Sequence, residues 1–221
     1  MENSKLDFTR QPIFVGIDVH KKSWSVTIQY EGIQLKTFSM NPEPEELSKY
    51  LNKNYPNGTY ISVYEAGFCG YWIDRQLRAL GIKNMIVNPA DVPTKNKEKK
   101  NKSDTIDSRK LVRELGSNNI EGIYIPSEED EAIRSLSRLR IQITKDQTRL
   151  KNRIKSLLNF VGIKIPGNDE LKHWSGKFIT YLSELEFRQE GIKLTLGHLL
   201  ENLKQVRNEL TKVIKDLRDL K

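Results

Sequence analysis

The sequence is poor in cysteine and histidine and has no long apolar run, and each shortage excludes a class of protein. Its 221 residues include one cysteine, Cys69, so neither an internal disulfide framework nor a cysteine-cluster metal site is possible. A reducing compartment, the cytoplasm, is therefore expected. The three histidines, His20, His173 and His198, are scattered and suggest no zinc site. No segment approaches the roughly 18 uninterrupted apolar residues of a membrane span, and no apolar signal core opens the chain.

Positive charge, by contrast, is in excess. The chain has 37 Lys and Arg against 29 Asp and Glu, which gives a formal net charge of +8. With 37% apolar and 30% charged residues, the composition is that of a folded globular protein. A basic folded protein favours a polyanionic partner, above all nucleic acid. The positions of the basic residues must decide whether this holds.

The first 125 residues are predicted to form one α/β domain. Three apolar segments separated by polar turns, over residues 13–18, 23–30 and 33–40, predict an antiparallel meander. Helical and extended patterns then alternate along the chain. The expected elements are a helix within 41–58, a strand over 59–67, a helix over 68–80, a strand over 83–89 and a helix from Ser103 or Asp104 to about Leu115.

From Ser127 onward the sequence predicts long helices. Four acids open the first one, where the helix dipole favours them, and Gly162 and Pro166 end it. Apolar residues at alternating spacings of three and four, most strictly from Leu196 to Leu220, are typical of a coiled coil. The two helices could pair as an antiparallel hairpin or across subunits. Because a helix seldom ends without a cap, the chain looks cut from a longer protein.

Four carboxylates stand out by position: Asp18, Glu65, Asp104 and Asp107. Asp18 ends the first strand and Glu65 the fourth, while Asp104 and Asp107 are spaced to share one helix face. If the two strands are neighbours, their acids emerge at the same edge of the sheet. Converging carboxylates repel one another unless a cation neutralises them, and hard oxygen ligands favour Mg²⁺ or Mn²⁺. Singly, each acid could be only a turn former or a helix cap; together they predict a metal site.

Three segments carry a resemblance to a known family. They are GIDVHKKSWSVTI at 16–28, YEAG at 64–67 and KSDTIDSRKLVREL at 102–115. In this order they resemble the signature segments of the DEDD insertion-sequence transposases, the group that includes the Piv invertase. Ser103 and Ser108 stand where threonine and alanine are expected in many relatives. The resemblance covers roughly residues 12–162.

The resemblance implies a fold, an activity and partners. It implies a ribonuclease H-like (RuvC-like) domain with a mixed sheet over residues 1–125, followed by a helical coiled-coil arm over 126–221. It also implies that Asp18, Glu65, Asp104 and Asp107 are the catalytic residues and hold Mg²⁺ around a scissile phosphate of DNA. Family members carry a C-terminal domain whose serine attacks DNA, and a structured bridge RNA guides them. This chain is expected to stop before that domain, and to form homo-oligomers through the coiled coil.

Basic side chains are expected to follow phosphate backbones. The candidates are Lys95, Lys97, Lys99, Lys100 and Lys102 in a lysine-rich loop, and in the first long helix Arg138, Arg149 and Arg153 above all, among Arg134, Arg138, Arg140, Lys145, Arg149, Lys151, Arg153 and Lys155. The alternative is that these charges are merely solvated. Trp24 and Trp72 are expected in the core.

Three other functions compete with this interpretation. An ATPase or sugar kinase on an actin-like fold needs glycine and hydroxyl residues after the first strand, where this chain has Val19-His20-Lys21-Lys22. A stand-alone junction nuclease with the same four acids predicts that this chain alone cleaves branched DNA. A binding module with vestigial acids predicts no measurable metal binding.

Overall fold

The computed structural model describes residues 7–93 and 104–220, and the side chains of the helix that begins at Asp104 are described from Ile106 onward. The chain divides into two compact units, residues 1–125 and 126–221. In the described ranges, no helix combines the length and the apolar character that a membrane crossing requires.

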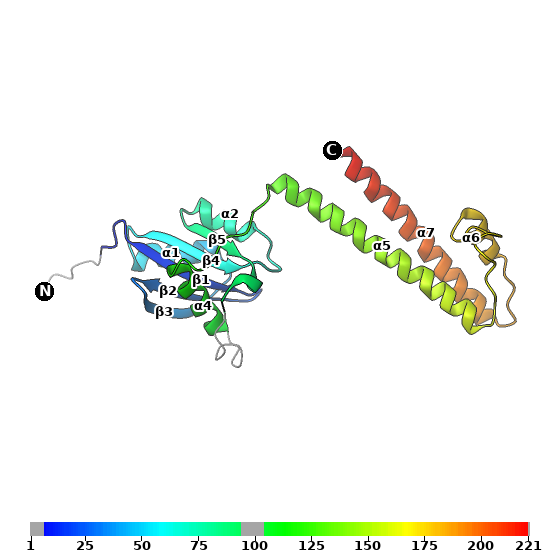
Figure 1. Ribbon diagram of the computed structural model, residues 1–221, viewed down its shortest axis with the longest axis horizontal. Helices are drawn as coiled ribbons and strands as arrows, with labels where there is room; N and C mark the ends of the chain where they lie inside the picture. The colour runs from blue at the N-terminus through cyan, green and yellow to red at the C-terminus, as the bar shows by residue number, and fades with distance from the viewer. Residues whose placement is uncertain (1–6, 94–103, 221) are drawn as a thin grey trace. The chain divides into compact units, whose positions relative to one another are not determined.

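The first unit is built on a five-stranded mixed sheet, shown in Figure 1. Its strands are β1 (Pro12–Val19), β2 (Trp24–Tyr30), β3 (Ile33–Met40), β4 (Thr59–Glu65) and β5 (Lys83–Val87). Their order is β3-β2-β1-β4-β5, with β1, β2 and β3 antiparallel and β4 and β5 parallel to β1. The predicted ribonuclease H-like fold is therefore confirmed.

Local sequence explains the meander. Glu31 and Gly32 both have positive φ, 47° and 77°, which a two-residue hairpin turn with the twist of the flanking strands requires. Along β2, Trp24, Val26 and Ile28 alternate with Ser25 and Thr27, so the two sets of side chains point to opposite faces of the sheet.

The apolar face of β2 belongs to the larger core. There Trp24, Val26 and Ile28 pack with residues of β1 and with the helices α1 (Pro44–Asn54) and α2 (Trp72–Ala79). Leu47 and Leu51 of α1 and Leu77 of α2 have no exposed surface. A short 3-10 helix, η1 (Pro89–Asp91), follows β5. Burial of this face is the main apolar contribution to the stability of the first unit.

Two predictions about the segment after β4 are wrong in part. The helix predicted over 68–80 begins only at Trp72, after a turn in which Gly70 has a positive φ. Trp72 is 44% exposed, whereas Trp24 is fully buried as predicted. The reason is helical geometry, since Ile73 and Leu77 point to the sheet and the neighbouring position of Trp72 turns outward.

Helix α4 (Asp104–Gly116) covers the opposite face of the sheet and crosses β1 at Gly16. A Cβ atom at Gly16 would lie 2.2 Å from the Ser108 carbonyl oxygen and 2.7 Å from the Val112 nitrogen. Leu111 and Leu115 of α4 pack into a second apolar cluster on this side. The close approach of helix and strand is thus possible only because residue 16 has no side chain.

Hydroxyl groups line the same contact. Ser108 Oγ lies 2.9 Å from Thr27 Oγ1 and 3.2 Å from Ser25 Oγ, and Thr27 Oγ1 lies 3.0 Å from Thr37 Oγ1. Ser25, Thr27 and Ser108 are buried, so each hydroxyl needs such a partner. Ser108, which stands where relatives are expected to have alanine, therefore finds its hydrogen-bond partners in the hydroxyl groups of β2.

Replacing Ser108 by alanine is expected to lower the free energy of unfolding by about 1 kcal/mol, because two buried hydroxyls lose one shared partner while Thr27 keeps Thr37. Thermal unfolding measures the change. Ser39→Ala, at an exposed position of β3, is the control and is expected to leave stability unchanged. Equal effects of the two substitutions would show that the hydroxyl cluster contributes nothing.

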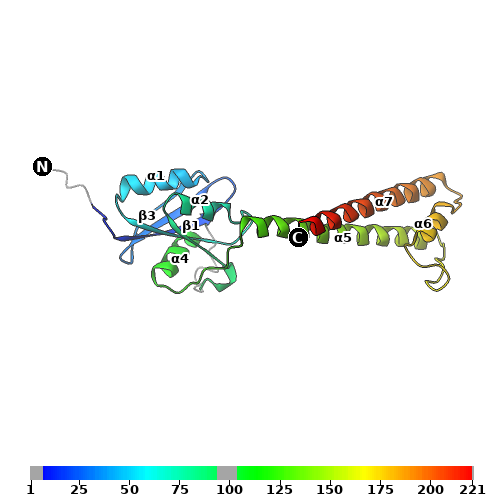
Figure 2. The same cartoon turned by 90° about the horizontal axis from the view of Figure 1, so that it is seen from above.

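The second unit is a helical hairpin with a small helix beside it. It contains α5 (Glu128–Phe160), α6 (Gly176–Ser183) and α7 (Glu190–Asp219). Figures 1 and 2 show α7 returning alongside α5 in the opposite direction. The sequence left open whether the two long helices pair with each other or across subunits. In the structure, α5 pairs with α7 of the same chain. Ser127 caps α5, and its Oγ accepts a hydrogen bond from the Asp130 nitrogen.

Candidate active site

The strand pairing places Asp18 and Glu65 side by side. Strands β1 and β4 are parallel neighbours, and Ile17 is opposite Tyr64, so the two acids follow at the same edge. Side chains alternate along a strand, and Phe14 and Val63 belong to the cluster under α4. Asp18, four residues after Phe14, and Glu65, two residues after Val63, therefore lie on the face that α4 covers.

Helix α4 adds Asp107 and a lysine to this edge. Lys110 Nζ lies 3.0 Å from Glu65 Oε1 and 3.6 Å from Asp107 Oδ1. The Lys110 side chain is only 8% exposed, while those of Glu65 and Asp107 are each 30% exposed. Two of the four predicted acids thus converge on a single cationic group.

Lys110 lies among the candidate site residues, although the sequence did not single it out. It follows Asp107 by three positions, the same spacing that separates Asp104 from Asp107, so the three residues share one face of α4. That spacing was the available signal. A buried ammonium group is tolerated only when opposite charges compensate it, and Glu65 and Asp107 supply them.

Asp18 has a different partner. Its Oδ2 lies 3.1 Å from His20 Nε2, in the turn between β1 and β2, and the two side chains are 20% and 49% exposed. The contact has an ionic component only when the imidazole is protonated. His20 is therefore a surface residue next to the acidic edge, positioned by Asp18.

The remaining predicted residues fall outside what the structure describes. Asp104 begins α4, but its side chain lies outside the described residues, as do all five lysines of the segment 95–102. Among the described side chains, no three acids, histidines or cysteines meet in one group that could hold a metal. A cluster of four carboxylates stays a prediction.

The chemistry of the donors nevertheless fits a divalent cation. Two carboxylates lie within 3.6 Å of one ammonium nitrogen, so the point between them attracts positive charge. Carboxylate oxygens are the ligands that Mg²⁺ and Mn²⁺ prefer. A metal ion bound by Glu65 and Asp107 would compete with the Lys110 ammonium for this position.

Aromatic and thiol groups follow Glu65 in the chain. Phe68 is 61% exposed, and Lys21 Nζ lies 5.7 Å from the centroid of its ring. This contact joins the β1–β2 turn, which follows Asp18, to the loop after β4. Burial raises the pKa of the Cys69 thiol, which makes a thiolate nucleophile unfavourable there. Cys69 packs against the main core.

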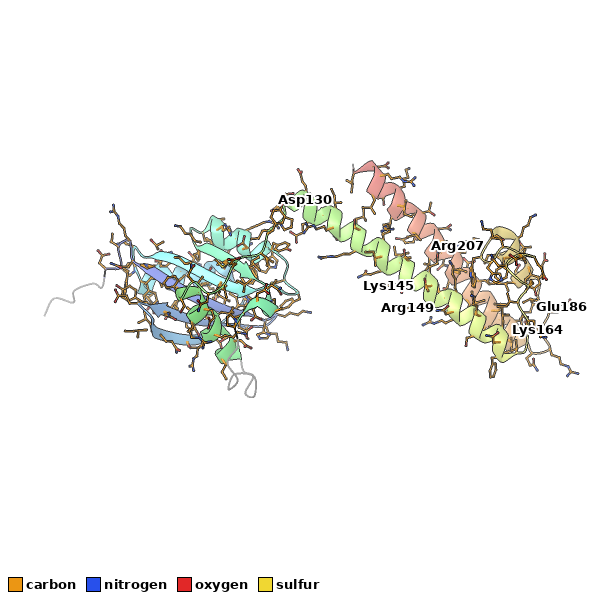
Figure 3. The ribbon with its side chains drawn as sticks, viewed as in Figure 1. Asp130, Lys145, Arg149, Lys164, Glu186 and Arg207 are labelled. Atoms are coloured by element: carbon orange, nitrogen blue, oxygen red, sulfur yellow. The ribbon has the colours of Figure 1, made fainter. Side chains whose placement is uncertain are left out.

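The predicted nucleic-acid contacts of the long helix are at the surface. Arg138, Arg149 and Arg153 of α5 are all exposed. Arg149 Nη1 lies 2.7 Å from Asp146 Oδ1, and both side chains are largely solvated. Figure 3 labels Lys145 and Arg149 on α5 and Arg207 on α7. Exposure leaves these groups accessible to a partner but does not identify one.

The first unit is thus a ribonuclease H-like domain: Asp18 and Glu65 lie at the ends of two adjacent parallel strands of its sheet, and the helix that crosses them adds Asp107. The sequence profile of the IS110-type DEDD transposase family matches residues 15–163, and the chain belongs to this family.

Individual relatives agree with this assignment. A protein of Sinorhizobium fredii (strain NBRC 101917 / NGR234), named "Putative transposase y4rJ", is 31% identical over 168 residues, 68% of this chain and 42% of that protein. The "Transposase for insertion sequence element IS1533" of Leptospira borgpetersenii is 27% identical over 216 residues, 96% of this chain and 61% of that protein. The chain therefore spans about two fifths to three fifths of the length of these two relatives.

Proposed function

We propose that this chain is the RuvC-like and coiled-coil part of a DNA recombinase that moves an insertion sequence. Asp18, Glu65, Asp104 and Asp107 hold Mg²⁺ or Mn²⁺ at a scissile phosphate of DNA. The observation that carries the proposal is the convergence of Glu65 and Asp107 on the ammonium group of Lys110, beside the strand end that bears Asp18. Residues 1–125 form the RuvC-like domain and residues 126–221 the coiled-coil arm.

Each part of the chain has a role in this proposal. Bound metal supplies charge stabilisation for phosphodiester cleavage. The four acids orient it, and Gly16 sets the distance between α4 and β1. A serine of a C-terminal domain makes the covalent link to DNA, by resemblance to the family. The site is expected to work in the cytoplasm, which the single cysteine supports.

Nucleic acids and a second copy of the chain are the proposed partners. The exposed arginines Arg138, Arg149 and Arg153, with the lysines of 95–102, bind the backbones of DNA and of a structured bridge RNA. Target sequence is then read by base pairing with the RNA, by analogy with other guided systems. Apolar residues of α5 that remain exposed, Leu139 at 39% and Ile141 at 47%, support homo-oligomerisation through the coiled coil.

Calorimetric titration with Mg²⁺ and with Mn²⁺, in the presence and absence of a branched DNA, tests the metal site. Wild type is expected to bind, and Asp18→Asn and Asp107→Asn are each expected to abolish measurable binding, because each removes one ligand charge. Asp146→Asn makes the same chemical change on the exposed surface of α5 and is expected to bind like wild type.

Two outcomes would favour the competing functions. If wild type binds no metal even with DNA, the acids are vestigial and the chain is a nucleic-acid-binding module. If this chain alone cuts branched DNA in the presence of metal, it is a junction nuclease that needs no serine domain.

A further inference from the structure

Basic residues dominate most of the first long helix and the turn after it. From Arg134 to Lys164 the sequence has nine basic residues and one acidic residue, Asp146. Six of the basic residues of α5 are exposed, but Lys151 and Lys155 are only partly exposed. These two lysines lie four positions apart, so they are neighbours on one face of the helix. The face of α5 that carries Lys151 and Lys155 points toward Trp174.

Both lysines lie against Trp174, in the loop before α6. Lys151 Nζ is 5.7 Å and Lys155 Nζ is 6.0 Å from the centroid of the Trp174 ring. The ring also meets Phe178 edge-on, with centroids 5.3 Å apart. An aromatic face attracts cations, so Trp174 fixes the direction of two otherwise flexible ammonium groups.

A third cation reaches the same place from α7. Arg207 Nη2 donates a hydrogen bond of 2.6 Å to the Trp174 carbonyl oxygen. Trp174 itself has a φ of +64°, a conformation that is rare for a bulky residue and is retained where the surroundings enforce it. Arg207 and the two lysines thus hold the loop in an otherwise unfavourable backbone conformation.

Among the described residues, these three cations have no acidic partner at ion-pair distance. Lys151 donates to the neutral Gln147 Oε1 at 2.9 Å, and none of the three forms an ion pair with a carboxylate in the part of the chain that is described. Burial, with added repulsion from Arg207 and Lys155, lowers the pKa of Lys151. Gathering like charges around one residue is unfavourable unless an anion binds to them.

We infer that Lys151, Lys155 and Arg207, arranged around Trp174, form a binding site for the phosphodiester backbone of a nucleic acid. Both lysine ammonium groups lie over the indole ring, so the site offers positive charge to a ligand. It therefore recognises backbone and not sequence. The inference rests on the proposed nucleic-acid function of the helical unit, and it goes further by joining two of the predicted helix lysines with Arg207 of α7 in one site around Trp174.

Salt-dependent binding tests the site directly. Fluorescence anisotropy with a labelled DNA duplex of about 20 base pairs, and with an RNA hairpin of equal phosphate number, gives the affinity between about 50 and 200 mM salt. Each phosphate contact contributes about 0.9 to the slope of log affinity against log salt. For the triple variant Lys151→Gln/Lys155→Gln/Arg207→Gln, three contacts are lost. The ratio of wild-type affinity to variant affinity should therefore be about 40 times larger at the lower salt concentration than at the higher one.

A charge-matched control separates a site from general electrostatics. Lys193→Gln/Lys212→Gln/Lys215→Gln removes the same charge from exposed positions of α7 and is expected to change the slope far less. The single variants Lys151→Gln and Lys155→Gln leave the Arg207 hydrogen bond intact, so each should lower the slope by about 1 in a folded protein.

The outcomes are decisive for this site. A larger loss with the cluster variants than with the control, for DNA, RNA or both, supports it and identifies the strand type. Equal loss with cluster and control variants, or no binding by wild type, overturns it. Because Mg²⁺ binding by the acids is measured separately, absent metal binding with an intact salt effect would overturn the metal site alone.

Discussion

Replacing Lys110 by methionine is expected to raise the affinity for Mg²⁺ by about tenfold or more. Lys110 Nζ lies 3.0 Å from Glu65 Oε1 and 3.6 Å from Asp107 Oδ1, which are two of the proposed ligands. At such distances a unit charge interacts with its partner by roughly 4 kcal/mol at an effective dielectric constant of about 20. A third of that interaction energy already corresponds to about a tenfold change in the affinity for Mg²⁺. Calorimetric titration with Mg²⁺ measures the change.

The same substitution is expected to destabilise the metal-free protein. Methionine leaves the Glu65 and Asp107 carboxylates without their shared cation, at a cost of roughly 1 to 3 kcal/mol, reduced because both side chains are 30% exposed. Thermal unfolding in EDTA should therefore begin at a lower temperature than for wild type. Added Mg²⁺ should restore more stability to the variant than to wild type, since it binds the variant more tightly.

Two further variants identify the cause. Lys110→Arg keeps the charge and is expected to retain the wild-type affinity for Mg²⁺. Lys53→Met removes an exposed charge at the end of α1 and is expected to change neither affinity nor stability. If Lys110→Met binds Mg²⁺ no better than wild type, Lys110 does not compete with the metal.

Replacing Gly16 by alanine is expected to cost about 3 kcal/mol of stability, at the upper end of the range for overpacking. The added Cβ would meet the Ser108 carbonyl oxygen at 2.2 Å and the Val112 nitrogen at 2.7 Å, and both are backbone atoms of α4. A flexible side chain could turn away, but here the whole helix must move. Because α4 also carries Asp107 and Lys110, affinity for Mg²⁺ should fall together with the unfolding temperature.

Gly67→Ala is the matched control in the same unit. The nearest atom to a Cβ at this position is the Glu65 carbonyl oxygen at 3.9 Å, which is an ordinary contact. A surface substitution of this kind usually changes stability by less than about 0.5 kcal/mol. If Gly16→Ala were equally mild, α4 would not depend on its close approach to β1.

The sequence predicted most elements because their signals are local. Alternation of side chains along β2 and the Glu31-Gly32 turn define two strands and their connection. Acids in the first turn and the Ser127 cap define the start of α5. The helix after β4 was predicted to begin four residues too early, because the turn that precedes Trp72 includes apolar residues which continue the helical pattern.

The candidate site was predicted only in part. Asp18 and Glu65 were identified because each follows an apolar strand, and the parallel pairing of β1 with β4 then makes them neighbours. The role of Lys110 depends on which face of α4 meets the sheet. Polar residues such as Ser25 and Thr27 look solvent-facing in the sequence but are buried under that helix.

By itself, the sequence determined the strands and helices, the family signature segments and the acids at the strand ends, because these follow from periodicity and from residues close together in the chain. Only the tertiary structure decided that α5 pairs with α7, that Lys110 lies between Glu65 and Asp107, and that three cations meet at Trp174. Such contacts join residues far apart in sequence. They depend on the packing of whole elements, which no local pattern encodes.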